Sequence, residues 1–124
     1  MLPADAHQRL PAGSRLTAGA RIREVLRRGN RQRTRDLDVF IAAAPGAAPR
    51  LGVIVPKHRH RIVERNLLKR RLREAGRRLL LPALRRADLR MDVILRARPT
   101  AYRSSWQELR AQVGRVAERL CSGG

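Results

Sequence analysis

Cysteine, aromatic residues and long apolar runs are almost absent from this chain of 124 residues. Its one cysteine, Cys121, has no partner for an internal disulfide or a thiolate metal cluster, which fits a reducing cytoplasm. No apolar run reaches the length of a membrane span, and residues 1–10 lack the basic and apolar segments of a secretion signal. The aromatic content of 2% argues against a sheet that stacks RNA bases on its rings. We therefore expect a cytoplasmic protein. If it binds a nucleic acid, we expect contacts mainly to the sugar–phosphate backbone and the shape of that nucleic acid, rather than to its bases.

Acidic residues are scarce as well, with 10 Asp and Glu against 29 Lys and Arg. The formal net charge of +19 attracts polyanions, and nucleic acid, an anionic membrane or an acidic protein would all satisfy it. The 43% hydrophobic content indicates that the basic residues cover a folded domain rather than form a disordered tail. We expect one domain over residues 15–121, with an irregular N-terminal segment at 1–14 and a tail at 122–124.

Helical spacing of apolar residues predicts a first and a last helix. The first covers residues 18–28, with Thr17 as its N-cap and Gly29 as its stop. The last begins at a capping box of Ser105 and Glu108. The apolar face of this last helix consists of Trp106, Leu109, Val113, Val116 and Leu120.

Three short apolar runs predict strands. Residues Leu37–Ala43 and Arg50–Val55 bracket a turn region at 45–49, and we expect them to be neighbouring antiparallel strands. Residues Met91–Ala97 predict a third strand, which Pro99 ends. Helices and strands in this order indicate an α+β sandwich.

The stretch from Lys57 to Arg78 has the highest charge density in the chain. A helical projection puts an apolar stripe on one side, formed by Leu68, Leu72, Ala75 and Leu79. A second face gathers an amide and four cations: Asn66, Lys69, Arg70, Arg73 and Arg77. The far side holds charges that can pair with one another: Glu64, Glu74, Arg71 and Arg78. The amide and cations suit a phosphate backbone, which favours RNA binding over a merely solvated charged face.

At these residues the sequence resembles the ribonuclease P protein family. The run RLGVIVPK ends at Lys57, as the family's strand does, and the family's signature helix is matched by Arg65, Asn66, Lys69, Arg70 and Arg73. Residues Arg15–Gly29 resemble the family's opening helix, and residues Asp88–Ala101 resemble its last strand.

The resemblance implies a two-layer α/β sandwich in the order α-β-β-β-α-β-α with a left-handed βαβ crossover, a fold shared with a ribosomal-protein domain. It also implies an RNA-binding cofactor of an endoribonuclease. With a catalytic RNA as partner, the enzyme would hydrolyse one phosphodiester to remove the 5′ leader from precursor tRNA. Mg²⁺ would be held mainly by that RNA, and the protein would supply no catalytic or metal-binding residue. Neither DNA nor a membrane is an expected partner.

Two RNA-facing surfaces follow from the resemblance. The catalytic-RNA surface comprises Lys57, Arg65, Asn66, Lys69, Arg70, Arg73 and Arg77. The leader-binding cleft comprises Ile22, Leu26, Arg35 and Phe40. Phe40 is the family's aromatic position in that cleft, yet a lone Phe on a strand also suits a core, and the sequence leaves both roles open.

The sequence departs from the family pattern at several positions. Leu67 replaces the second arginine of the signature, while Arg59 and Arg61 lie in a turn where small residues are usual. Ile22 and Leu26 replace aromatic residues of the opening helix. His58 and His60 are expected to be solvated loop residues or phosphate donors rather than metal ligands. The alternatives are a structural RNA-binding protein such as a ribosomal protein, a DNA-binding module and a membrane-surface protein.

Overall fold

The computed structural model describes residues 12–45, 47–57 and 59–122. In chain order its elements are turn η1 (Ala12–Ser14), helix α2 (Gly19–Arg28), strands β1 (Asn30–Arg33), β2 (Leu37–Ala43) and β3 (Arg50–Ile54), helix α3 (Ile62–Ala75), π-helical turn η2 (Gly76–Leu80), helix α4 (Leu81–Arg86), strand β4 (Met91–Ala97), 3-10 turn η3 (Pro99–Arg103) and helix α5 (Trp106–Ser122). This confirms the expected α-β-β-β-α-β-α order. No helix among these residues is long and apolar enough to cross a membrane.

The sheet has the strand order β1-β2-β4-β3. Strand β4 pairs antiparallel with β2 and parallel with β3, so it lies between the two strands that we expected to be neighbours. That expectation was wrong because β2 and β4 bury almost every residue, while β3 is partly exposed at both ends. Strands that are apolar on both faces occupy the centre of a sheet, which leaves β3 at the edge.

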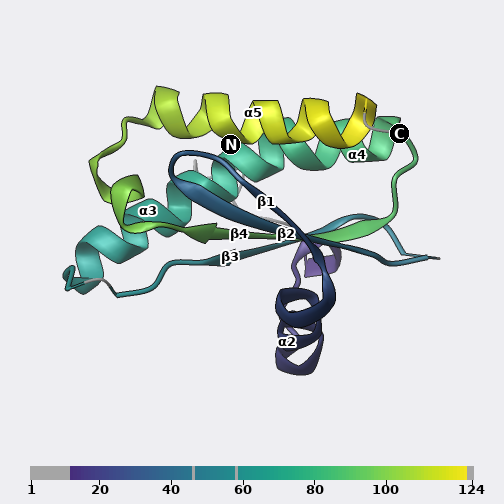
Figure 1. Cartoon of the computed structure of the whole chain (residues 1–124), viewed down its shortest axis with the longest axis horizontal. Coiled ribbons are helices and arrows are strands. Elements are labelled where there is room, and N and C mark those ends of the chain that lie inside the picture. Colours follow the sequence, from purple (N-terminus) through teal and green to yellow (C-terminus); the bar gives the residue numbers. More distant parts are fainter. Residues whose placement is uncertain (1–11, 46, 58, 123–124) are drawn as a thin grey trace, which may run out of the picture.

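Helices α3, α4 and α5 cover one face of the sheet, and α2 lies with the N-terminal turn η1 against part of the opposite face (Figure 1). The chain leaves β3, passes through α3 and α4, and returns as β4 beside β3 in the same direction. Seen with these strands pointing up and the helices in front, β4 lies to the left of β3 (Figure 1). The crossover is therefore left-handed, the rare hand for parallel strands.

The sheet separates two apolar clusters. The main core lies between the sheet and α3–α5 and contains the residues of β2 and β4 that point to that side, such as Val39, Val93 and Leu95. The smaller cluster, on the α2 side, consists of Leu16, Val25, Phe40 and Ile94, with Ile22, Leu26, Ala42 and Ile54 packed around it. The second face of the sheet is thus covered over only part of its length.

A fully buried carboxylate fixes α2 to the sheet. Asp92 accepts hydrogen bonds from Arg21 of α2 (Nε–Oδ2 2.8 Å) and from Arg50 of β3 (Nε–Oδ1 2.8 Å and Nη2–Oδ2 2.8 Å). Arg21 also donates to the Ala43 carbonyl oxygen at 3.0 Å. Burial raises the pKa of Asp92, but the hydrogen bonds from Arg50 and Arg21 outweigh burial and lower it. These contacts set the distance and angle between α2 and the strands.

The C-terminal end of α2 matches the prediction, and its N-terminal end does not. Ala18, not Thr17, occupies the N-cap position, and no side chain caps the helix there, so the predicted cap was wrong. Gly29 ends the helix as predicted, and its N–H donates to the Val25 carbonyl oxygen at 2.8 Å. A Cβ on Gly29 would lie 2.5 Å from that oxygen and 2.9 Å from the Ile41 carbonyl oxygen. Only glycine lets helix and strand approach so closely.

The long basic helix is interrupted by a π-helical turn. Regular α3 ends at Ala75, and residues 59–61 before it lie in the expected connecting turn. Leu68, Leu72 and Ala75 are buried as expected, but Leu79 is only half-buried and Leu80 is fully buried instead. The π-helical turn adds one residue to the helical repeat, which moves the buried stripe along by one position.

At the start of α5, Ser105 and Glu108 form the predicted capping box. The Ser105 N–H donates to Glu108 Oε1 at 2.9 Å, and the Glu108 N–H donates to Ser105 Oγ at 3.1 Å. Ser122 still belongs to α5, so the helix continues into the expected tail. Residues 1–11 of the expected irregular segment lie outside the described residues, and 12–14 form the 3-10 turn.

A buried polar network joins the β1–β2 turn to α5. Asp36 is fully buried and accepts hydrogen bonds from Ser104 Oγ and from Gln112 Nε2 (2.6 Å), while Gln112 Oε1 accepts the Asp36 N–H at 2.9 Å. Burial raises the pKa of Asp36, but these hydrogen bonds and those from Thr100 and Arg35 outweigh burial and lower it to about 2. The ionised carboxylate therefore stabilises the fold.

This network predicts an acid-dependent difference between the wild type and Asp36→Asn. Because the pKa of Asp36 falls from 3.8 to about 2 on folding, its contribution is complete above pH 5 and disappears as the pH falls through 2. Urea unfolding at a series of pH values should show the stability gap between the two proteins shrink by about 2 kcal/mol over this range. Glu118→Gln, which changes an exposed carboxylate, is the control and should show a constant gap. A constant gap for Asp36→Asn would contradict this account.

Candidate nucleic-acid interface

Helix α3 carries cations that the protein itself does not neutralise. We call Arg65, Asn66, Lys69, Arg70 and Arg73 the signature face. Asn66, Arg70 and Arg73 are exposed, whereas Arg65 and Lys69 are partly buried. Among the described residues, none of the four cations forms a salt bridge. The buried Leu68 and Leu72 hold the helix against the main core, so the face is presented by a rigid element.

Arg77 lies outside this unpaired set although the sequence analysis placed it there. Its guanidinium contacts the Glu74 carboxylate (Nη2–Oε1 2.6 Å, Nε–Oε2 3.2 Å), and Arg78 pairs with the same carboxylate. Burial raises the pKa of Glu74, but the two guanidiniums outweigh burial and lower it. Arg77 is therefore paired within the helix, and it shares a single carboxylate with Arg78.

The loop before α3 is held in place by aromatic and polar contacts. The His60 ring stacks on Tyr102, with centroids 3.6 Å apart and planes 7° apart, and Tyr102 donates to the Pro56 carbonyl oxygen at 3.0 Å. His60 Nδ1 also lies 3.0 Å from Glu64 Oε2, while Glu64 Oε1 accepts the Arg61 N–H at 3.1 Å. His60 is thus a partly buried loop residue whose ring packs on Tyr102. His58 lies outside the described residues.

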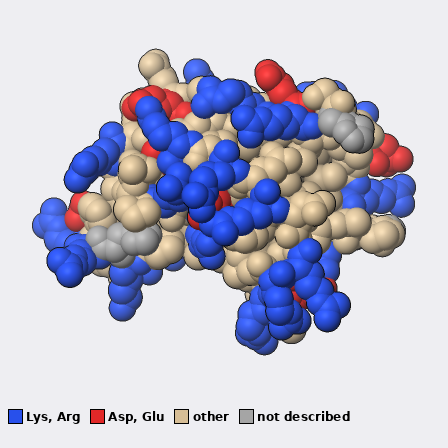
Figure 2. All heavy atoms as spheres, viewed as in Figure 1, with Lys and Arg blue, Asp and Glu red and all other residues tan. Residues whose placement is uncertain are grey.

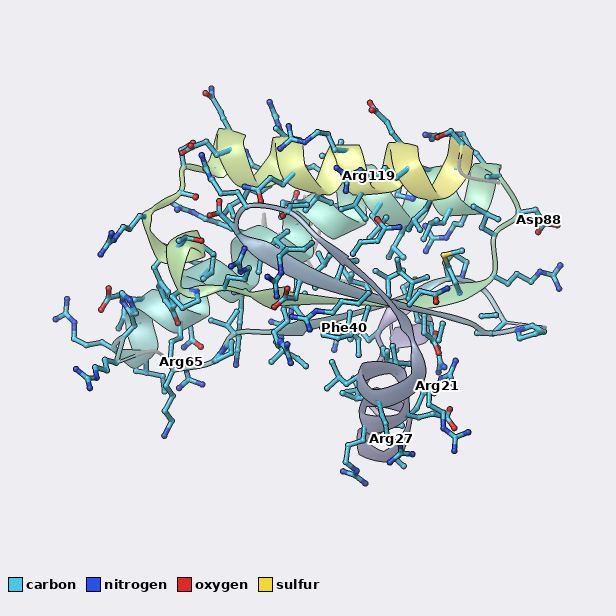
Figure 3. All side chains as sticks on the ribbon, in the orientation of Figure 1. Arg21, Arg27, Phe40, Arg65, Asp88 and Arg119 are labelled. Atoms are coloured by element: carbon cyan, nitrogen blue, oxygen red, sulfur yellow. The ribbon has the colours of Figure 1, made fainter. Side chains whose placement is uncertain are left out.

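Lys57 follows strand β3 and is exposed at the same end of the molecule as the start of α3. Lysine and arginine side chains crowd over this end and again over α2 (Figure 2). Arg65 lies at this end, whereas Arg21 and Arg27 lie on α2 below the sheet and Arg119 lies on α5 in the opposite layer (Figure 3). The structure therefore presents its cations in separate regions.

A second basic region occupies the part of the sheet that α2 leaves uncovered. Three guanidiniums surround one carboxylate there: Arg33 Nε lies 3.0 Å and Arg31 Nη2 lies 3.1 Å from Asp38 Oδ1, and Arg96 Nη2 lies 3.5 Å from Oδ2. Burial raises the pKa of Asp38, but the hydrogen bonds from Arg31 and Arg33 outweigh burial and lower it. Three positive charges against one negative leave this region cationic.

Phe40 lies beneath the guanidiniums of this region, which we call the sheet cleft after the cleft that the resemblance implies (Arg31, Arg33, Asp38, Phe40 and Arg96). Its side chain is only 5% exposed, and the guanidinium carbons of Arg96 and Arg31 lie 4.8 Å and 5.6 Å from its ring centroid. These are cation–π distances. Ile22 and Leu26 of α2 pack against the same small cluster, so the structure brings three of the four expected cleft residues together.

Arg35, the fourth expected cleft residue, lies elsewhere. Its Nη2 is 2.7 Å from Glu108 Oε2, 3.2 Å from Asp36 Oδ2 and 3.2 Å from Ser104 Oγ. The β1–β2 turn carries Arg35 toward α5 because Asp36 is buried in the network described above. Arg35 is therefore separated from the sheet cleft.

Sequence reasoning missed Arg31, Arg33 and Arg96. The signal was present in the alternation of strand residues, because Arg31 pairs across the sheet with Phe40 and Arg33 with Asp38. Directly paired residues share a face. However, strand β1 reads NRQR, which has no apolar residue, so its alternation is invisible until its pairing with β2 is known. The described residues hold no group of three or more His, Cys, Asp or Glu side chains that could bind a metal ion.

The family model and the relatives that match this sequence all belong to one protein family. The sequence profile of the family Ribonuclease P matches residues 10–121. The ribonuclease P protein component of Pseudarthrobacter chlorophenolicus is 37% identical over 102 residues, covering 82% of this chain and 72% of the relative. That of Acidothermus cellulolyticus is 34% identical over 117 residues, covering 90% of this chain and 91% of the relative.

Solved structures show the same fold. The RNase P protein of Staphylococcus aureus superposes with a TM-score of 0.72 at 22% identity, covering 86% of this chain and 94% of that one. The RNase P protein of Thermotoga maritima superposes with a TM-score of 0.71 at 20% identity, covering 85% and 96%.

The burial of Phe40 predicts a loss of stability in Phe40→Leu. Leucine cannot fill the flat space between α2 and the two guanidiniums, so we expect the free energy of unfolding to fall by about 1 to 1.5 kcal/mol. Urea unfolding monitored by circular dichroism measures the change. An unchanged unfolding midpoint would show that the ring is not packed in this cluster.

Proposed function

The chain belongs to the ribonuclease P protein family, and from that membership we propose a separate role in RNA binding for each of its two basic surfaces. Its function is that of the protein component of ribonuclease P, an endoribonuclease of tRNA processing. The family match excludes the ribosomal-protein and DNA-binding alternatives that composition alone left open. The partners are the catalytic RNA and precursor tRNA, and the place of action is the cytoplasm.

The signature face binds the catalytic RNA. The observation that carries this proposal is that Lys69, Arg70 and Arg73 extend from a rigid helix without a salt bridge to any described residue. A cation that is already paired with a carboxylate would have to break that ion pair before it could bind a phosphate. Lys69, Arg70 and Arg73 can form a charge-assisted hydrogen bond to a phosphate without that cost. The exposed Asn66 amide adds one donor and one acceptor beside them.

The sheet cleft binds the single-stranded 5′ leader of precursor tRNA. Arg31, Arg33 and Arg96 offer several N–H donors toward one strip of surface, and their excess charge attracts phosphates. Because Phe40 is buried beneath two of these guanidiniums, it supports them from below and does not stack on a leader base. The leader is then recognised through its backbone, in keeping with the low aromatic content.

The residues of these two surfaces do not fit a bound Mg²⁺ ion. Mg²⁺ prefers carboxylate oxygens and water, yet Asp38 in the sheet cleft is ringed by guanidiniums and Glu74 near the signature face holds Arg77 and Arg78. The Mg²⁺ ions that hydrolysis of the phosphodiester requires are therefore assigned to the RNA. The protein contributes positive charge that draws two polyanions together.

Arg70→Ala and Arg73→Ala should each weaken binding of the catalytic RNA by about 1 to 3 kcal/mol, because each removes a charge-assisted contact. Equilibrium binding at fixed salt measures the loss. Arg119→Ala removes an equal charge from the exposed face of α5 and is the matched control, and Arg78→Ala, whose side chain is paired with Glu74, should also matter little. Equal losses at all four positions would indicate diffuse attraction without a defined face.

The protein alone should not cleave precursor tRNA, because it supplies no nucleophile, but it should lower the Mg²⁺ concentration that its RNA partner needs. Cleavage assays over a Mg²⁺ series, with RNA alone, protein alone and both together, measure this. RNA-free cleavage that survives further purification would contradict the cofactor role.

A further inference from the structure

Three large apolar side chains stand out as exposed, and all three lie in the first two turns of α3. Ile62 is 66% exposed, Val63 is 73% exposed and Leu67 is 39% exposed, and no other large hydrophobic side chain among the described residues is classed as exposed. Elsewhere the fold buries or half-buries such residues, including those of the neighbouring turns of the same helix. The main core therefore does not explain why this helix begins with apolar residues.

These side chains form one patch that continues the signature face. Val63 and Leu67 are four residues apart, as are Ile62 and Asn66, so each pair lies on one side of the helix in successive turns. Arg70 follows Leu67 by three residues and Asn66 by four, which places it next to both rows. The apolar patch at the start of α3 is thus directly adjacent to the cations in the middle of α3.

The charges around the patch decide what can cover it. Arg59 and Arg61 are exposed before the helix, Arg70 is exposed after it, and the nearby carboxylate of Glu64 is already engaged by His60 and Arg61. A second copy of this chain, itself carrying +19, would be repelled. The complementary partner is a polyanion with apolar faces, which describes RNA with unpaired nucleotides.

We propose that Ile62, Val63 and Leu67 pack against the faces of unpaired nucleobases in the catalytic RNA while the adjacent cations bind the flanking phosphates. This inference rests on the proposed role of the signature face and adds an apolar component to it. Side chains cannot read the deep, narrow major groove of paired RNA, whereas unpaired nucleotides expose flat apolar faces at the surface. Leu67 stands where the family signature has an arginine. At this position the leucine side chain packs on a base, whereas an arginine would bind a phosphate.

The salt dependence of binding separates an apolar contact from an ionic one. A phosphate contact releases counterions, so its loss reduces the slope of log affinity against log salt by about 1, whereas loss of an apolar contact leaves that slope unchanged. The double variant Val63→Ala/Leu67→Ala removes most of the patch and keeps a strong helix former at both exposed positions. Thermal melts should therefore match those of the wild type.

Affinity of the full-length double variant for the catalytic RNA should fall about tenfold at every salt concentration, with the wild-type slope. Arg70→Ala, the comparison, should lose affinity and also reduce the slope. If Arg70→Ala weakens binding and the double variant does not, the apolar contact is refuted while the role of the signature face stands. If neither variant weakens binding, the proposed function of this face fails as well.

Two further outcomes would overturn the inference. A reduced slope in the double variant would mean that the substitutions act through displaced cations rather than through base packing. A wild-type dimer in sedimentation, lost in the double variant, would assign the patch to a second copy of the chain. The inference predicts a monomer for both proteins.

Discussion

Carboxylates are so few in this chain that their positions decide which cations remain available for RNA. With 29 basic and 10 acidic residues, most guanidiniums cannot find an internal partner. The three aspartates of the sheet and its β1–β2 turn, Asp36, Asp38 and Asp92, are buried and each accepts from arginines. Together with Glu108 they join α2 to the sheet and the β1–β2 turn to α5. Among the described cations without a salt bridge, Lys69, Arg70 and Arg73 share one face of α3, where a rigid helix presents them. Fold and binding surface thus follow from the same distribution of charge.

Much of this fold could be predicted from local sequence patterns, because some elements depend mainly on their own residues. Strands β2 and β4 are short, mainly apolar runs, and Ser105 with Glu108 forms a cap through contacts three residues apart. Strand β1 could not be predicted in this way, since its polar residues form a strand only by pairing with β2. The place of β4 between β2 and β3 likewise depends on which strands bury both faces, a property of the assembled sheet. The π-helical turn that begins at Gly76 packs closely on β3, because a Cβ on Gly76 would collide with Leu51 Cδ2.

The candidate site shows the same limit. Helical projection correctly gathered Asn66, Lys69, Arg70 and Arg73, because their spacing alone fixes a shared face. It could not show that Arg77 pairs with Glu74, or that Arg35 contacts Glu108, which lies 73 residues away in the chain. Whether an arginine is free for RNA depends on such distant partners, and the sheet cleft around Asp38 became visible only through cross-strand pairing. The resemblance identified the family and the fold, while the structure identified which cations are free.

Arginine modification by phenylglyoxal, read by mass spectrometry at each residue, tests most directly the claim that two separate surfaces serve two RNAs. When the catalytic RNA is added without tRNA, we expect Arg70 and Arg73 to be protected and Arg119 to stay reactive. Adding precursor tRNA in place of mature tRNA should then protect Arg31 and Arg96 of the sheet cleft. Uniform protection of all exposed arginines by the catalytic RNA, Arg119 included, would contradict the account, because it would mean that net charge alone and no particular surface binds RNA.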